Sequence, residues 1–148
     1  SLEEVISSAV GRFRKRFPEV QVQVCIPESF IMVPMDATLI EQVINNLLEN
    51  AYFHSGSHGP IDLQASVDGP YVSIAIRDQG NGIRPELLGT LFDGGGVSDN
   101  QTGDSHKGMG IGLTLCKTII NAHGGHIEAS NYDKGALFTF TLPDWREY

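Results

Sequence analysis

The clearest helical pattern in the chain covers residues 37–55, with the sequence ATLIEQVINNLLENAYFHS. Its apolar side chains recur at steps of three and four residues, which places them on one face of an α-helix. They are Ile40, Val43, Ile44, Leu47, Leu48 and Ala51. Asp36 precedes the pattern at an N-cap position, where a carboxylate accepts a hydrogen bond from the first turn. These residues predict one long amphipathic helix.

A different face of the same helix carries amides. Gln42, Asn46 and Asn50 are spaced by four residues, so their side chains share one side. Asparagine is a mediocre helix former, and two of them on one face suggest a specific role. An amide oxygen suits Mg²⁺, which takes few protein ligands and keeps most of its waters. The alternative is an ordinary solvated face.

The sequence before and after residues 37–55 contains further helical patterns and stretches in which apolar and polar residues alternate, and these predict the rest of the fold. The other predicted helices cover residues 2–17, 85–88 and 111–122. The predicted strands cover residues 20–26, 31–35, 61–67, 72–76, 127–131 and 136–142. Asp68-Gly69 is a hairpin turn signal. Three main helices and about six strands predict an α/β (α+β) fold, a two-layer sandwich with helices on one face of a mixed, mostly antiparallel sheet.

The composition excludes several classes of protein. The 148 residues suit a single domain, and 18 Asp and Glu against 10 Lys and Arg give a net charge of −8. That balance argues against a nucleic-acid binder, but one nucleotide can be held by backbone amides and a metal. Cys25 and Cys116 lack the spacing of a zinc site or a disulfide framework. No apolar run approaches the roughly 20 residues that span a bilayer, so we expect no membrane contact by this domain, and the scarcity of cysteines favours a reducing compartment such as the cytoplasm.

Glycines concentrate in the second half of the chain, where 13 of 17 lie between Gly80 and Gly135. One cluster, Asp78-Gln79-Gly80-Asn81-Gly82, directly follows a predicted strand. Glycines there let the backbone turn and leave room for a flat ligand, and the aspartate can accept the exocyclic amine of adenine. The alternative is an ordinary turn.

The other cluster, GMGIGL at residues 108–113, opens the helix predicted over 111–122. Glycines before a helix N-terminus expose N–H groups at the positive end of the helix dipole, which favours a phosphate. The spacing differs from Gly-x-Gly-x-x-Gly and follows a loop, which argues against a dinucleotide fold. A hinge before an ordinary helix is the alternative. We expect the Gly-, Asp- and Ser-rich residues 93–110 to form a mobile lid.

The order of these motifs resembles the catalytic ATP-binding domain of sensor histidine kinases. The matching boxes are residues 42–55 (N), 78–82 (G1), 91–92 (F), 108–113 (G2) and 135–143 (terminal strand). The resemblance implies the GHKL (Bergerat) fold, which gyrase, Hsp90 and MutL share. Details such as Leu47-Leu48-Glu49-Asn50-Ala51 are similar to the KdpD type.

The resemblance also implies roles for residues in an ATP–Mg²⁺ site. Asp78 would accept the adenine amino group, Asn50 would bind Mg²⁺, and Asn46 would contact phosphate or organise the site as its catalytic residue. The remaining nucleotide-binding positions would be Gly80, Gly82, Ile83, Lys107, Gly108, Gly110, Gly112 and Leu113. The γ-phosphate would pass to a histidine on a separate dimerisation domain, expected before residue 1, and then to a response regulator. Alone, the chain would bind ATP and transfer nothing.

Departures from the family pattern keep two alternatives open. The N box usually has Lys where this chain has Phe53, for which His54 or Lys107 could substitute, and Gly95 replaces the second aromatic of the F box. Ala136 stands where the family often has Thr. These changes are the evidence for a degenerate module that responds to nucleotide without kinase activity. An ATP hydrolase of the gyrase or MutL kind is the other alternative. The resemblance places a Glu in such enzymes at the position of Asn46, where it would act as general base, and an amide cannot take this role.

Overall fold

The computed structural model describes residues 1–27, 32–54, 59–93, 104–132 and 134–144, with the backbone alone for residues 54 and 104–111. Its helices are α1 (Leu2–Arg16), α2 (Ala37–His54), α3 (Pro85–Leu88) and α4 (Asp104–Ala122), with a 3₁₀ turn η1 (Leu91–Asp93). Its strands are β1 (Val22–Cys25), β2 (Ile61–Asp68), β3 (Tyr71–Arg77), β4 (His126–Tyr132) and β5 (Gly135–Pro143). Among the described helices, none is both long and apolar enough to cross a membrane.

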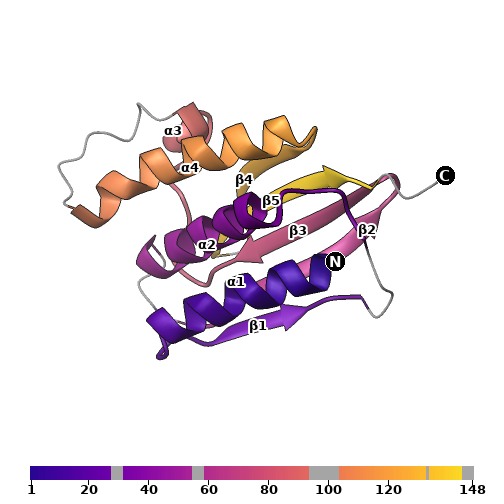
Figure 1. The fold of residues 1–148 in the computed structure, drawn as a ribbon. Helices are drawn as coiled ribbons and strands as arrows, with labels where there is room; N and C mark the ends of the chain where they lie inside the picture. Colours follow the sequence, from indigo (N-terminus) through magenta and orange to yellow (C-terminus); the bar gives the residue numbers. More distant parts are fainter. Residues whose placement is uncertain (28–31, 55–58, 94–103, 133, 145–148) are drawn as a thin grey trace.

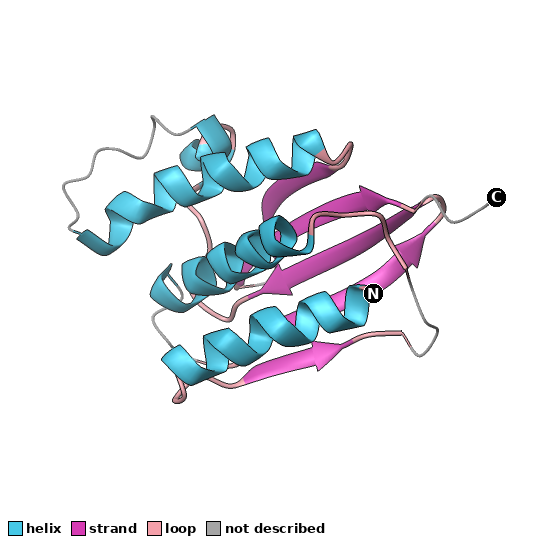
Figure 2. Cartoon of the chain, viewed as in Figure 1, coloured by secondary structure: helices cyan, strands magenta, loops and turns pink. Residues whose placement is uncertain are grey.

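The strands form one mixed sheet in the order β1-β2-β3-β5-β4. β1 runs parallel to β2, and the other neighbours are antiparallel. α1, α2 and α4 lie on one face of this sheet, as Figures 1 and 2 show. The predicted two-layer sandwich is therefore confirmed.

The core lies between the two layers. Along β3 and β5 every second residue points inward, so that Ile74 faces the core beside its partner Phe140, and Ile76 beside Phe138. In α1, predicted as the helix over residues 2–17, six apolar residues are buried: Leu2, Val5, Ile6, Ala9, Val10 and Phe13. The apolar face predicted for residues 37–55 is buried as well. Burial of these faces is the main force that holds the helices on the sheet.

Local hydrogen bonds fix the helix ends. The Ser1 hydroxyl accepts the Glu4 N–H at 3.3 Å in a capping box on α1. The predicted N-cap of α2 is confirmed, because Asp36 Oδ1 accepts the Leu39 N–H at 3.1 Å. Two residues after the end of α4, Gly124 has φ 79°. Its N–H donates to the Asn121 carbonyl and the Gly125 N–H donates to the Ile120 carbonyl, which satisfies acceptors of the last turn. Such a left-handed residue favours glycine.

Three expectations about the elements are wrong. Residues 32–35 form no strand, and Pro34 there lacks the N–H that a sheet ladder needs. The sheet therefore has five strands instead of six. In the strand predicted over residues 20–26, valines alternate with polar residues, which predicts that Val24 is buried on the same face as Val22, but Val24 is 38% exposed. The last long helix begins at Asp104 and not at Ile111, so that Gly108 and Gly110 are helical.

Candidate functional site

Asp78 is buried directly beyond the end of β3, with 4% of its surface exposed. Its Oδ1 accepts two backbone N–H groups, from Gly80 at 2.9 Å and from Ala136 at 3.1 Å. The Asp78 N–H in turn donates to the Ala136 carbonyl at 3.0 Å. Both side-chain hydrogen bonds within the described chain go to Oδ1, which leaves Oδ2 available to a ligand. The predicted acceptor is thus held in one orientation by its own fold.

Gly135 packs against this aspartate more closely than any other residue type could. A Cβ atom at Gly135 would lie 1.9 Å from the Asp78 carbonyl oxygen and 2.8 Å from Oδ1. The first glycine of the terminal strand motif is therefore required by its contact with Asp78. The alanine that follows it serves through its backbone N–H, so replacement of the family's Thr at this position leaves that hydrogen bond intact.

The turn after Asp78 is held by a side chain from β4. Asn131 Oδ1 accepts the Ile83 N–H at 2.7 Å, and its Nδ2 donates to the Ile83 carbonyl at 2.8 Å. Gly82 has φ 81°, and a Cβ there would lie 2.7 Å from Asn131 Oδ1. Sequence reasoning missed Asn131. Its one signal was an asparagine within a predicted strand, where this residue type is uncommon.

Gln42, Asn46 and Asn50 form the amide face of α2. This face is exposed to solvent at Gln42 and contacts α4 at Asn46. Gln42 is exposed, whereas Asn50 is only 8% exposed and its Nδ2 is buried without a hydrogen-bond partner. Asn46 Nδ2 lies 3.8 Å from the Cys116 Sγ of α4. A Cβ at Gly112 would lie 3.7 Å from Asn46 Cγ. Two predicted site residues, Asn46 and Gly112, are therefore brought together.

Cys116 closes the interface between α2 and α4 behind Asn46. Burial raises the pKa of the Cys116 thiol to about 12, and the hydrogen bond from Asn46 opposes this rise. Its Sγ also lies 3.9 Å from the Val43 carbonyl oxygen. The thiol therefore stays protonated and acts as a small packing group next to the site.

The glycine-rich start of α4 differs from the expected phosphate cradle. Gly108 and Gly110 lie within the helix and not before its N-terminus, so their N–H groups do not form the expected terminal anion site in this conformation. Leu113, another predicted contact, is 1% exposed and belongs to the core. Of the lid expected over residues 93–110, residue 93 ends η1 and residues 104–110 belong to α4, so that part of the expectation is wrong. Residues 94–103 and the side chains of Lys107 and His54 lie outside the described residues.

The side chains near α2 that could hold a metal ion are amides, a ligand type that suits magnesium. Within the described ranges, no group of three or more His, Cys, Asp or Glu side chains could hold an ion. The Asn50 Nδ2 is buried without a hydrogen-bond partner, and the amide oxygen of the same side chain is the atom that would hold the ion. Because Mg²⁺ takes few protein ligands and completes its shell with water and phosphate oxygens, one amide is a sufficient protein contribution.

Comparison with known proteins agrees with this geometry. Residues 35–146 match the family described as histidine kinase-, DNA gyrase B- and HSP90-like ATPases. The chain belongs to this family. It is 43% identical over 143 residues to the sensor protein KdpD of Clostridium acetobutylicum, and 33% identical over 144 residues to KdpD of Escherichia coli. These alignments cover 96% and 97% of the chain but 16% of each relative.

A solved structure supports the same assignment. The catalytic domain of histidine kinase ThkA, in a nucleotide-free form, superposes with a TM-score of 0.80 at 26% identity. The superposition covers 97% of this chain and 94% of that domain. The predicted family and its fold are thereby confirmed.

The identity of residue 46 on α2 bears on the choice between hydrolysis and transfer that the sequence leaves open. Asn46 stands where the resemblance places the general base of the hydrolases, and an amide cannot abstract a proton. The nearest carboxylate in the sequence, Glu49, forms an ion pair with Arg16 of α1. Its side chain is thus directed to α1.

Phe53 belongs to an aromatic cluster between α1 and α2. Its ring centroid lies 5.8 Å from that of Phe17 and 5.1 Å from that of Tyr52, and 43% of its surface is exposed. The family's usual lysine charge is therefore replaced by a packing contact.

Proposed function

We propose that this domain binds ATP with Mg²⁺ and delivers the γ-phosphate to a histidine of a separate dimerisation domain. The observation that carries the proposal is the buried Asp78, whose Oδ1 is saturated by the N–H groups of Gly80 and Ala136. A buried carboxylate with one oxygen fixed and one free suits recognition of a hydrogen-bond donor. The exocyclic amine of adenine is such a donor.

The turn after Asp78 would form the wall of the base pocket. Gly80 is buried, and the peptide between Gly82 and Ile83 is fixed by Asn131. Glycines leave the base in contact with the backbone, and the Ile83 side chain, partly buried against the core, offers an apolar surface. Because these groups are already in place, nucleotide binding would cost little conformational entropy.

The phosphates would lie between α2 and the start of α4. Asn50 would hold Mg²⁺ through its amide oxygen, with Asn46 beside the phosphates. The metal would neutralise phosphate charge during transfer. Each helical glycine costs about 1 kcal/mol relative to alanine, so Gly108 and Gly110 make the first turns of α4 easy to rearrange toward phosphate. Lys107 would be carried with them.

Transfer is favoured over hydrolysis by the residues that surround the phosphates. Asn46 can orient a phosphate or a water, but it cannot accept a proton from that water. Glu49 is engaged by Arg16. Phosphoryl transfer needs positioning and charge neutralisation more than covalent chemistry from the protein. Asn46 and Asn50 would position the phosphates and the metal, and the metal would neutralise the charge.

The similarity to KdpD suggests the setting in which the domain works. The relatives are named sensor proteins, and the chain spans 16% of their length. We infer that it serves as the cytoplasmic catalytic part of a membrane-anchored sensor. Its partners would be its own dimerisation domain and, in the complete system, a response regulator.

Two measurements test the proposal. Calorimetry with a non-hydrolysable ATP analogue should show saturable binding that requires Mg²⁺ for full affinity. Absence of heat with and without Mg²⁺ would instead support a degenerate module. In the second test, the domain is mixed with its dimerisation domain and labelled ATP. Acid-labile, base-stable label on that partner supports the kinase, whereas free phosphate without labelled protein supports a hydrolase.

A further inference from the structure

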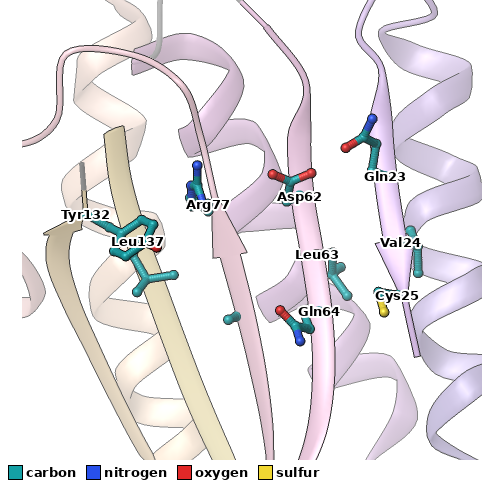
Figure 3. A pocket seen from close by; sticks show the side chains of 10 residues that line it. Gln23, Val24, Cys25, Asp62, Leu63, Gln64, Arg77, Tyr132 and Leu137 are labelled. Atoms are coloured by element: carbon teal, nitrogen blue, oxygen red, sulfur yellow. The ribbon is translucent and has the colours of Figure 1, made fainter. Parts of the chain in front are cut away.

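The sheet face opposite the helices contains a hollow of about 480 Å³ (Figure 3). α1, α2 and α4 all lie on the other face (Figures 1 and 2). All five strands contribute to the lining of the hollow. Its volume falls within the range of roughly 300–1,000 Å³ that is typical of small-molecule sites. The hollow is separate from the proposed nucleotide site, which lies on the helical side.

The hollow is crossed by a row of four side chains on adjacent strands. In the strand register Gln23 pairs with Asp62, Asp62 with Arg77, and Arg77 with Leu137. Neighbours in such a row have Cβ atoms about 4.5–5.5 Å apart. Ala75 precedes this row on β3, and its methyl group leaves space between the longer side chains around it.

Arg77 and Asp62 carry opposite charges into this hollow without pairing with each other. No ion pair of the described residues includes either of them. The Arg77 guanidinium carbon lies 4.6 Å from the centroid of the Tyr132 ring, and its Nε is buried without a hydrogen-bond partner. Figure 3 shows the two charged groups at the same level of neighbouring strands.

An open antiparallel sheet commonly has a polar, hydrated face, and most of this face fits that description. The charges of Arg77 and Asp62 are the exception, because neither side chain forms an ion pair within the described residues. The Arg77 Nε is buried and out of reach of the hollow, so a ligand there would meet the terminal nitrogens of the guanidinium and the Asp62 carboxylate. A simple anion would be repelled by the Asp62 carboxylate, and a simple cation would be repelled by Arg77.

We propose that this hollow binds a small zwitterion of the α-amino-acid class. Its carboxylate accepts hydrogen bonds from the planar guanidinium of Arg77, a pairing for which arginine is well shaped. Its ammonium group donates to Asp62. Its side chain lies over Ala75, against Leu137 and the ring of Tyr132. Charge complementarity therefore selects the ligand, and the apolar floor favours a small aliphatic side chain.

The site adjoins the base pocket along the chain. Arg77 immediately precedes Asp78, and Leu137 immediately follows Ala136, the residue whose N–H holds the Asp78 carboxylate. Amino-acid binding can nevertheless be measured without nucleotide. If no amino acid binds, the proposed ATP site is unaffected, and if ATP does not bind, the proposed amino-acid site is unaffected.

The test titrates the whole 148-residue chain with L-alanine and L-leucine in the absence of nucleotide, by calorimetry and by amide chemical shifts. Acetate and methylamine, each with one of the two charges, are the comparison probes. We expect saturable binding of the amino acids, shifts centred on β2 and β3, and at least about tenfold weaker binding of either single-charge probe. Absence of saturable binding, or acetate binding as tightly as L-alanine, overturns the proposal.

Two variants and one control locate the binding. Arg77→Met keeps an unbranched stem against Tyr132 and removes the guanidinium, and Asp62→Asn removes a charge at nearly constant shape. Both should lose L-alanine binding. Arg12→Met makes the same charge change on α1 and should bind as the parent does. If Arg77→Met does not fold, Asp62→Asn decides: unchanged L-alanine affinity in that variant contradicts the proposal.

Discussion

Asn131 and Ile83 are joined by two hydrogen bonds, of 2.7 and 2.8 Å, across 48 residues of sequence. The Asn131 amide satisfies both the N–H and the C=O of one residue, as a neighbouring strand would. This contact fixes the turn after Asp78 to β4. The position of the proposed base pocket therefore depends on a side chain outside the glycine cluster.

Asn131→Ala should lower both stability and nucleotide affinity. Loss of two hydrogen bonds to the Ile83 peptide should reduce the free energy of unfolding by about 2 kcal/mol. The freed turn should also weaken binding of an ATP analogue, measured by calorimetry at a temperature where the variant is fully folded. Asn121→Ala changes an exposed asparagine near the end of α4 and is the control; it should lower neither quantity, since alanine is the better helix former. Nucleotide affinity equal to that of the parent would contradict the positioning role.

Asp78→Asn should separate binding from folding. The asparagine Oδ1 can still accept the N–H groups of Gly80 and Ala136, so the melting temperature should stay close to that of the parent. The second side-chain atom becomes an NH₂ donor, which faces the donor amine of adenine. A buried polar group without a partner costs about 1–3 kcal/mol, so affinity for ATP should fall roughly 10- to 100-fold. Unchanged affinity would remove the adenine assignment.

Gly135→Ala should destabilise the domain by its contact with Asp78. The new methyl group would lie 1.9 Å from the Asp78 carbonyl oxygen, so the backbones of β5 and the turn must separate. Overpacking of this kind typically reduces the free energy of unfolding by about 1–3 kcal/mol, measurable by urea titration. Gly11→Ala is the matched control, because a Cβ there meets nothing within 4 Å. That change in the interior of α1 should stabilise the domain by up to about 1 kcal/mol.

The elements with strong local patterns were predictable from the sequence. The apolar spacing of residues 2–17 and 37–55 identified the buried faces of α1 and α2, and Asp68-Gly69 placed the β2–β3 hairpin. The start of α4 was predicted wrongly, because its glycines have the composition of a loop. In the structure the helix continues through them to Asp104.

The arrangement of the candidate site was predictable only where its residues form a local motif. Asp78 was identifiable because it follows a strand and opens a glycine cluster. The partners of the site residues were not, since Asn131 acts across 48 residues and Cys116 contacts Asn46 across 70. Such pairings arise from the strand register and helix packing, which no short segment encodes.

Cys116 should be inert to thiol reagents in the folded domain. With its pKa raised to about 12 by burial, its thiolate fraction near pH 8 is on the order of 10⁻⁴. Mass spectrometry after alkylation should therefore show modification at the exposed Cys25 alone, and at both cysteines after denaturation. The unfolded thiol ionises near pH ~8.5, so the unfolded state holds fewer protons above that pH. The contribution of this group to stability should accordingly fall as the pH rises from about 9 toward 12.

Phe53→Lys should strengthen ATP binding and weaken the fold. The resemblance to the N box places a lysine at this position, and a cation there would attract the phosphates. We expect a several-fold rise in ATP affinity that diminishes at high salt, because screening shortens the reach of an exposed charge. Loss of the ring contacts with Phe17 and Tyr52 should reduce stability by about 1 kcal/mol.

Phe53→Met is the matched control for this charge. It removes the same ring without adding a cation, so it should lose similar stability and leave ATP affinity unchanged. Calorimetry at two salt concentrations compares the two variants directly. If Phe53→Lys and Phe53→Met bind ATP equally, residue 53 lies too far from the phosphates to act on them. Neutralisation of the phosphate charge would then have to come from the metal at Asn50 and from the start of α4.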